Sequence, residues 1–334
     1  MEGVPTPPET SSLPKTAVTA PSGLKAVDKE TTAGVLFGFG AYGLWGLLPL
    51  YFFALMPAGA VEIVANRVVW SLLFCILLVT VTRSWRALAN AFRERAMFGT
   101  LALAAALIAV NWLTYTYGVT TGQAVEAALG YFINPLVSVL LGVLVLKEKL
   151  RPLQWAAVGI GFIAVGVLTW SYGKLPWIAL TLAFSFGLYG FVKKRVGPKV
   201  DAVTSLSVET IVLAPIAAVA MVVLGVTGTA TLDSQGPGHF WLLAASGVIT
   251  AVPLLFFGAS ARRLPMTTIG LLQYVAPVLQ FIVALVVFRE AMTPDRWIGF
   301  GVVWLALLVL TVDMLRTAGK NSTARKRAKL NAVS

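Results

Sequence analysis

The chain has 334 residues, of which 58% are hydrophobic and only 12% are charged, and its mean hydropathy of +0.83 requires a lipid bilayer as its environment. Its single cysteine and single histidine exclude a disulfide framework and any Cys- or His-rich metal site, so we expect no metal and no cofactor. The formal net charge of +12 would suit nucleic acid, but most basic residues lie in short loops between apolar segments, which argues against a nucleic-acid partner.

Ten apolar segments follow one another along the chain, each close to the about 20 residues that a helix needs to cross a bilayer core. In lipid a segment must satisfy its own backbone hydrogen bonds, so each one is predicted to be an α-helix. We therefore expect an all-α integral membrane protein with ten transmembrane helices. The predicted spans are Ala33–Met56, Val61–Val81, Met97–Gly118, Gln123–Leu146, Leu153–Trp170, Leu175–Val192, Leu206–Val226, Phe240–Ala259, Thr267–Phe288 and Trp297–Met314.

Two polar segments flank the spans. Residues 1–31 are rich in Pro, Ser and Thr and have little to bury, which predicts a disordered arm rather than a cleaved signal peptide. Residues 316–334 form a basic tail that contains ARKRAKL. This tail either lies on anionic headgroups or only follows the charge bias of cytoplasmic segments, and we favour the second interpretation.

The Lys and Arg residues alternate between the loops. Nearly all of the 26 lie in the two terminal segments or in every second loop, whereas the other loops hold only Lys174, Arg289 and Arg296. The positive-inside rule then places both termini in the cytoplasm, with the chain in a bacterial inner (plasma) membrane. The alternation also requires an even number of spans.

Two segments of the chain are alike. Around Pro135 and Pro277, which are 142 residues apart, the sequences align without a gap. The identical pairs are Pro135 and Pro277, Glu148 and Glu290, Pro152 and Pro294, Trp155 and Trp297, Gly159 and Gly301, Ala164 and Ala306, Leu168 and Leu310, and Thr169 and Thr311. Each half holds five spans, an odd number, so residues 32–171 and 172–315 are predicted to be inverted repeats. This arrangement is typical of secondary transporters, whose substrate site lies between the halves.

Arg67 is the charged residue that lies deepest in a predicted span. A charged side chain at such a depth is costly and is a functional candidate by default. Helical spacing puts Trp70 on the same face, and Glu126, which enters its own span from the same side, is the expected counter-ion. Two interpretations stay open: a structural ion pair, or the involvement in substrate binding or gating that we favour.

Three carboxylates are candidates for coupling a proton to transport. Glu62 shares a helical face with Asn66, a further binding candidate, near the external end of its span, and Glu209 lies in a related place near the cytoplasmic side. Together with Glu126 they could be buried in one state and hydrated in another, and burial raises a carboxylate pKa. The alternative is that Glu62 and Glu209 are interfacial and merely solvated.

Pro135 and Pro277 stand at matching places in the two halves, and a proline kinks a helix by freeing a carbonyl one turn earlier. Glu126 and Asn134 belong to a narrow polar stripe that ends at Pro135. Matching interruptions predict a binding site. The candidates beside these kinks are Tyr131, Asn134, Gln273 and Tyr274. Two more, Asn111 and Trp112, lie in the third span, where Asn111 either lines a cavity or joins two helices.

The chain resembles the EamA family of the drug/metabolite transporter superfamily, and closely its RarD branch, the chloramphenicol-sensitivity proteins. The stretches that carry the resemblance are YGLWGLLPLYF, EIVANRVVWS, NWLTYTYGV, EAALGYFINPLVSVLLGVLVLKEKLRPLQW, IALTLAFSFGLYG, VPLLFFGASARRLP and GLLQYVAP, within residues 32–315. The resemblance implies ten helices, an inverted repeat, the inner membrane and export of small metabolites or drug-like compounds. Asn66 stands where the family usually has His, so a mechanism that titrates this His is in doubt here.

These observations predict a secondary active transporter that exports a small organic solute by alternating access, with protons as the expected coupling ion. The expected partners are the solute, protons and membrane lipids, and the protein is a monomer or a homodimer. The alternative is an integral-membrane enzyme that acts on a lipid or lipid-linked substrate. We find no catalytic residues for it: the chain has no His-containing motif, Asp-rich metal pair or nucleophilic serine elbow.

Overall fold

The computed structural model describes residues 22–147, 150–196, 199–261, 263–264 and 266–331, and throughout these ranges the only regular structure is helix. The helices are α1 (Ser22–Ala54), α2 (Ala60–Val81), α3 (Trp85–Arg93), α4 (Arg95–Thr120), α5 (Ala124–Leu146), α6 (Pro152–Tyr172), α7 (Trp177–Val196), α8 (Ala202–Val226), α9 (Pro237–Ala261), α10 (Met266–Leu272), α11 (Val275–Ile282), the π-helix η1 (Val283–Val287) and α12 (Pro294–Asn331).

The predicted all-helical membrane fold is confirmed. Eight of the helices are long and apolar enough to cross a bilayer, and two shorter apolar helices, Trp177–Lys193 and Val275–Val287, bring the total to ten. Each of the ten predicted spans overlaps one of these helices, and the ends agree within four residues except in the ninth span, which was predicted to begin at Thr267 whereas the apolar helix begins at Val275.

Three segments differ from the predictions because polar sequence does not prevent a helix. Helix α1 begins at Ser22, inside the arm that was expected to be disordered, and α12 continues through the basic tail to Asn331. Helix α3 occupies a predicted basic loop. It is amphipathic: Leu88 and Ala91 are buried against α4 and α8, while Arg86 and Arg93 are exposed. Residues 1–21 of the predicted arm lie outside the described residues.

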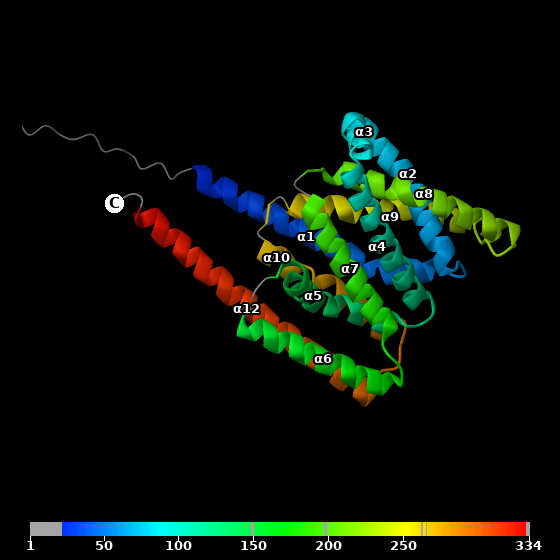
Figure 1. The fold of residues 1–334 in the computed structure, drawn as a ribbon. Coiled ribbons are helices and arrows are strands. Elements are labelled where there is room, and N and C mark those ends of the chain that lie inside the picture. Colours follow the sequence, from blue (N-terminus) through cyan, green and yellow to red (C-terminus); the bar gives the residue numbers. More distant parts are fainter. Residues whose placement is uncertain (1–21, 148–149, 197–198, 262, 265, 332–334) are drawn as a thin grey trace, which may run out of the picture.

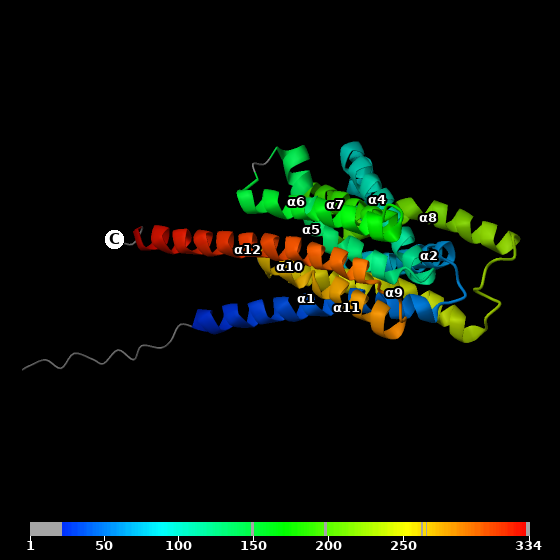
Figure 2. The ribbon, with the colours of Figure 1, turned by 90° about the horizontal axis from the view of Figure 1, so that it is seen from below.

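The two halves pack with two-fold pseudosymmetry. Helices α1, α2, α4, α5 and α6 have α7, α8, α9, α10–α11 and α12 as their counterparts. The pairs α2–α8 and α6–α12 join equivalent helices, and they lie side by side in two views (Figures 1 and 2). The contacts of α9 with α1 and α2 recur as contacts of α4 with α7 and α8, and the α1–α11 contact recurs as α7–α5. This exchange of partners is what inverted five-helix repeats require.

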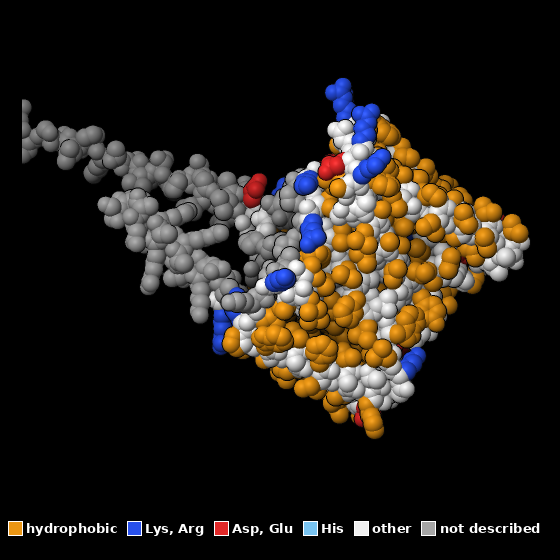
Figure 3. Space-filling view, in the orientation of Figure 1, with side chains coloured by type: hydrophobic (Ala, Val, Ile, Leu, Met, Phe, Trp, Pro, Cys, Tyr) orange, Lys and Arg blue, Asp and Glu red, His pale blue; other side chains and the backbone are white. Residues whose placement is uncertain are grey.

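The surface is divided by residue type. Figure 3 shows hydrophobic side chains over most of one face, with Lys and Arg gathered along the edge beside α3. We call this the basic edge. The loops 55–59, 121–123, 173–176, 227–236 and 288–293 lie at the other ends of the helices, at what we call the opposite edge (Figure 1). An apolar belt between two polar edges matches the hydrocarbon core of a bilayer.

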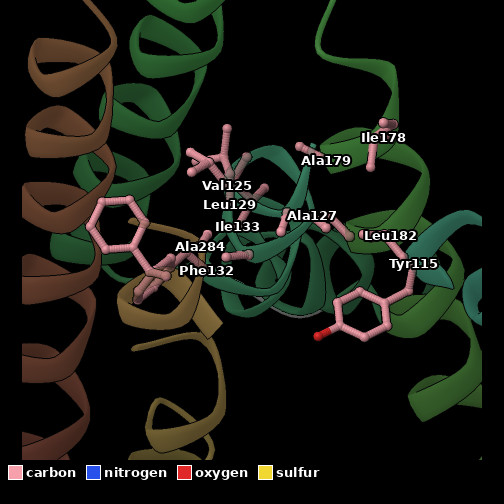
Figure 4. Close-up of a cluster of buried hydrophobic side chains, with 14 of the residues drawn as sticks. Tyr115, Val125, Ala127, Leu129, Phe132, Ile133, Ile178, Ala179, Leu182 and Ala284 are labelled. Atoms are coloured by element: carbon pink, nitrogen blue, oxygen red, sulfur yellow. The ribbon is translucent and has the colours of Figure 1, made fainter. Parts of the chain in front are cut away.

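Helix α5 lies at the centre of the largest buried cluster. Every residue from 124 to 130 is buried, and Figure 4 shows side chains of α5 next to those of α7 and Ala284. Gly130 permits this packing, because a Cβ there would lie 2.7 Å from the carbonyl oxygen of Ala179 and from the Cβ of Leu182. Gly247 plays the same part between α9 and α2, where a Cβ would lie 2.5 Å from the backbone of Trp70. These close approaches fix the helices that carry the candidate site.

Candidate substrate site

Arg67 lies on α2 with only 4% of its surface exposed. Its guanidinium carbon is 4.6 Å from the centre of the Trp112 ring and 5.3 Å from that of Phe52, both within cation–π range. Its Nε donates a hydrogen bond of 3.1 Å to the hydroxyl of Thr250 on α9. The side chain is therefore held from three directions, by α1, α4 and the second half of the protein.

Arg67 has no counter-ion among the described residues. No carboxylate there lies within 4.0 Å of the guanidinium, Thr250 is its one hydrogen-bond partner, and Nη1 is buried without any. The predicted pairing with Glu126 is wrong. The Glu126 carboxylate instead accepts a hydrogen bond of 3.0 Å from the backbone N–H of Ile178, because the first turn of α7 offers unpaired N–H groups and a positive dipole end.

Aromatic rings surround the buried charge. Tyr115 packs edge-on against Phe52 at 5.9 Å and against Tyr131 at 5.4 Å, and the Phe52 ring in turn lies beside the guanidinium. The hydroxyl of Tyr115 is buried and has no hydrogen-bond partner among the described residues; Figure 4 shows this side chain at the border of the α5 cluster. We call Phe52, Arg67, Asn111, Trp112, Tyr115, Tyr131 and Thr250 the Arg67 site.

A short polar network fixes one wall of the Arg67 site. The hydroxyl of Tyr131 donates to Oδ1 of Asn111 at 2.9 Å. The Asn111 amide donates in turn to the hydroxyl of Ser185 at 3.1 Å and to the carbonyl of Leu182 at 3.2 Å. Asn111 therefore joins α4 to α7, as one of its two predicted roles requires, and it also orients Tyr131 beside the guanidinium.

In the second half of the protein the position equivalent to Arg67 carries a charged residue that has an ion-pair partner. Glu209 follows Arg67 by the same 142 residues that separate the two repeats, and it is also buried, at 3% exposure. Its carboxylate is paired with the Lys193 ammonium at 2.5 Å and accepts hydrogen bonds from Tyr189 at 3.1 Å and Ser205 at 2.9 Å. The repeat thus places one fully paired charge and one unpaired charge at matching sites.

Three carboxylates fasten the opposite edge. Glu62, 1% exposed, accepts hydrogen bonds from the backbone N–H groups of Thr231 and Leu232 at 2.7 and 3.0 Å. Glu126 binds the start of α7, and Glu290 accepts from the N–H groups of Ala124 and Val125 at 2.6 and 2.9 Å, at the start of α5. The alternative that Glu62 and Glu209 are merely solvated is therefore wrong for both.

Glu290 lies in a loop outside the membrane-spanning helices. Burial raises the pKa of its carboxyl, and the two N–H groups of α5 and the positive charge of Arg296 counteract only part of that rise. The duplicated sequence identified Glu290 as a marker of the repeat and gave no sign of this contact.

Several predicted residues lie away from the Arg67 site. The Asn66 amide donates to the carbonyl of Glu62 and to the sulfur of Met221 on α8, and Trp70 packs edge-on against Phe240. Asn134 faces Gly187 of α7, so the polar stripe of α5 is a packing face against α7. No described contact joins Asn66, Trp70 or Asn134 to Arg67.

The helix is broken beside one of the two predicted kinks. Gln273 and Tyr274 form the break between α10 and α11, one turn before Pro277, as the missing proline N–H requires. Helix α5 contains Pro135 without such a break and packs along α7. Helix α11 packs against α1 and α5, and no described contact joins Gln273 or Tyr274 to Arg67.

An apolar cleft of about 290 Å³ lies between α1 and α9, next to the Arg67 site. Tyr51, at its inner end, donates a hydrogen bond of 2.5 Å to the carbonyl of Leu242 across the two helices. Leu44, Leu47 and Val248 of the same lining are 41–47% exposed, so the cleft opens on the apolar belt. The residues that line it are Leu44, Leu47, Leu48, Tyr51, Val248, Ile249, Val252 and Pro253.

Sequence reasoning missed four residues of this region. Tyr115 had a signal, because it is one helical turn from Asn111 in NWLTYTYGV. Tyr51 and Phe52 close the stretch YGLWGLLPLYF but gave no sign of facing α2. Thr250 had none, because a threonine in a span usually bonds its own helix, as its hydroxyl also does to the Ser246 carbonyl at 2.7 Å.

Comparison with known proteins agrees with this architecture. The family model described as the EamA-like transporter family matches residues 32–170 and again 175–312, one match for each half. The chain belongs to the EamA-like transporter family. A solved crystal structure shares the fold with a TM-score of 0.56 at 18% identity, covering 86% of this chain and 99% of that chain.

Bacterial relatives cover nearly the whole chain. "Protein RarD" of Streptomyces exfoliatus is 50% identical over 310 residues, 93% of this chain and 96% of that protein. An "Uncharacterized transporter" of Vibrio cholerae is 38% identical, covering 89% and 98%. The "Chloramphenicol-sensitive protein RarD" of Pseudomonas aeruginosa is 34% identical, covering 86% and 97%. These names confirm the predicted RarD resemblance and support a multi-pass bacterial membrane transporter.

The Arg67 site combines a buried positive charge with aromatic walls and, among the described residues, one N–H and one O–H donor that lack a hydrogen-bond partner. Nowhere in the described ranges do three His, Cys, Asp or Glu side chains gather as metal ligands. Groups of this kind can interact with an anionic or aromatic group by charge and shape.

Proposed function

We propose that this protein is a secondary active transporter that exports a small organic solute by alternating access, and that the Arg67 site binds the solute. The observation that carries the proposal is Arg67 itself: a buried charge that has no counter-ion among the described residues and is held between α2 of one repeat and Thr250 of the other. A charge left unpaired inside a membrane protein points to a ligand pathway. Membership of a transporter family supports this interpretation over that of a membrane enzyme.

We also propose that the basic edge faces the cytoplasm, with both termini on that side. The gathering of Lys and Arg along that edge supports this orientation through the positive-inside rule (Figure 3). The opposite edge, fastened by Glu62, Glu126 and Glu290, would then be the closed external gate, and the Lys193–Glu209 pair would be a latch near the cytoplasmic side.

Proton coupling fits this gate. A carboxyl that is buried when the gate closes and hydrated when it opens binds its proton more tightly in the closed state. A proton taken up from outside would then favour the closed state of the external gate, and it would be released on the cytoplasmic side. The burial of Glu290 at this edge supports it in this role. The predicted coupling carboxylates Glu62, Glu126 and Glu209 are proposed as further positions at which a proton could be carried.

The test is flux through purified protein in proteoliposomes. A comparison of metabolites in the medium of overexpressing and deletion cells selects the solute, and the name of one relative makes radiolabelled chloramphenicol a second probe. We expect saturable counterflow that is lost in Arg67→Ala and kept in Arg86→Ala, whose arginine is exposed on α3. An Arg67→Ala variant that inserts normally and transports at the wild-type rate would remove Arg67 from the substrate site.

A further inference from the structure

We infer that Arg67 binds the carboxylate of an aromatic monocarboxylic acid, which supplies the counter-ion that no described side chain provides. This inference rests on the proposed function and adds the substrate class to it. The solute would sit with its charged group at the guanidinium and its ring against Trp112 and the neighbouring tyrosines.

The first argument is a comparison within the molecule. Where this fold buries Glu209 at the equivalent position, it supplies Lys193, Tyr189 and Ser205 as partners. It also pairs the buried Asp313 with Arg151 at 2.5 Å. Among the described residues Arg67 has a single hydrogen bond, to the neutral hydroxyl of Thr250, and no ion pair. Burying an ion without its partner strongly disfavours folding. The missing partner is therefore to be sought in the ligand.

The second argument is the direction of the free donors. Thr250 occupies Nε, and Trp112 and Phe52 lie within cation–π distance of the guanidinium. The Nη end of the planar group is left, and a planar carboxylate can accept two parallel N–H bonds from such an end. One unpaired cation balances one negative charge, which favours a monocarboxylate over a phosphate with two charges.

A second donor without a partner lies in the same aromatic shell. The Tyr115 hydroxyl is buried and makes no hydrogen bond within the described ranges, and its ring contacts the Phe52 ring that lies beside Arg67. A phenol can donate to a carboxylate oxygen. Two unsatisfied donors within one shell of aromatic rings indicate an acceptor group that is supplied from outside.

The aromatic side chains around Arg67 determine which groups besides the carboxylate the solute can carry. Phe52, Trp112, Tyr115 and Tyr131 present rings, which favour a flat apolar body. In the described part of the chain no carboxylate is free near these rings to pair with an ammonium group: Glu62, Glu126 and Glu209 already bind other groups. We therefore expect aromatic acids to bind better than the corresponding amino acids or amines.

The experiment measures binding without transport, by calorimetry on the purified full-length protein in lipid nanodiscs. Four probes share one ring and differ in charge: phenylacetate, phenylacetamide, phenylalanine and phenethylamine. We expect phenylacetate to bind about tenfold or more tightly than the neutral amide, because a charge-assisted bidentate contact is lost. Phenylalanine and phenethylamine should bind more weakly still.

Variants identify the contact. Arg67→Gln should abolish the preference for the acid, Arg67→Lys should keep part of it, and Tyr115→Phe should weaken phenylacetate binding more than phenylacetamide binding. Arg86→Gln is the matched control and should behave as wild type. Unfolding curves show that each variant is folded.

Three results would overturn the inference: equal affinity for acid and amide, an unchanged preference in Arg67→Gln, or no phenylacetate binding at millimolar concentration. The outcome is separable from that of the proposed function. If phenylacetate binds but no counterflow is observed, the proposed transport function is refuted and the anion site is kept. If counterflow is observed but binding shows no preference for the acid, the anion site is refuted and the transport function is kept.

Discussion

Replacing Arg67 with methionine tests whether its charge truly lacks a protein partner. Methionine keeps the length of the apolar stem and removes the charge. One hydrogen bond to a charged donor contributes about 1.5–3 kcal/mol, and each desolvated cation–π contact about 2 kcal/mol, so Thr250, Trp112 and Phe52 together contribute about 5–7 kcal/mol. Removing an ion from water costs several kcal/mol even after relaxation. These terms nearly cancel, so we expect Arg67→Met to change the free energy of unfolding by less than about 2 kcal/mol while ligand binding is lost.

The assay is thermal unfolding of purified protein in detergent, without ligand. For a chain of this size each kcal/mol corresponds to about 2 °C or less in Tm, so Tm should stay within about 4 °C of the wild-type value. Arg86→Met on the exposed face of α3 should change stability by less than about 0.5 kcal/mol. If Arg67→Met instead loses about 3–5 kcal/mol, the amount typical of a broken buried ion pair, then Arg67 has a counter-ion in the protein and the reasoning fails.

Three further predictions concern the helix contacts. Ala124→Cys, made in a Cys75→Ser background, should become less reactive toward a membrane-impermeant maleimide as the pH falls, because burial raises the pKa of Glu290 and protonation favours the closed edge. Each rate is divided by that of the exposed Ser234→Cys at the same pH, because maleimide reacts with the thiolate and every thiol therefore reacts more slowly in acid. With Glu290→Gln added, the divided rate should be low and independent of pH, and a divided rate that rises in acid would reverse the assigned sign. Glu62→Gln should destabilise the attachment of loop 227–236 by about 1–3 kcal/mol, because the neutral amide accepts hydrogen bonds from Thr231 and Leu232 more weakly than the carboxylate does. Proteolysis of this loop should therefore be faster than in the wild type, and an unchanged rate would contradict the prediction. Gly130→Ala should destabilise by about 1–3 kcal/mol in thermal unfolding, because its Cβ would lie 2.7 Å from Ala179 and Leu182, and a neutral result would mean that α5 and α7 can separate freely.

The fold could be predicted from the sequence because a chain in lipid can form only structures that satisfy all of their own backbone hydrogen bonds. A run of about 20 apolar residues must be a helix, and the duplicated segment with five spans per half fixes the inversion. Helix α3 escaped the prediction because nine residues, Trp85–Arg93, are too short and too polar to be a span, and only its packing on α4 and α8 reveals it.

The site could be predicted only in part. The cost of burial identified Arg67. Tyr131 was a candidate because it lies beside the Pro135 kink, and Asn111 and Trp112 because a polar residue in the third span lines a cavity or joins two helices. The supposed counter-ion of Arg67, Glu126, was wrong, because similar depth in two helices does not fix which faces meet. Backbone N–H groups at helix starts compete for carboxylates, and no residue type in the sequence marks them.

The unequal treatment of positions 67 and 209 is a property of the inverted repeat itself. The repeat gives both residues similar burial and similar depth from opposite sides, so the difference between them comes from side chains alone. A charge that braces the fold must find its partner within the chain, as Glu209 finds Lys193. A charge that binds a solute must remain unpaired in at least one conformation, because an internal partner would compete with the solute for the same donors. By this criterion the proposed binding charge lies in the first half, and the charge that braces the fold lies in the second.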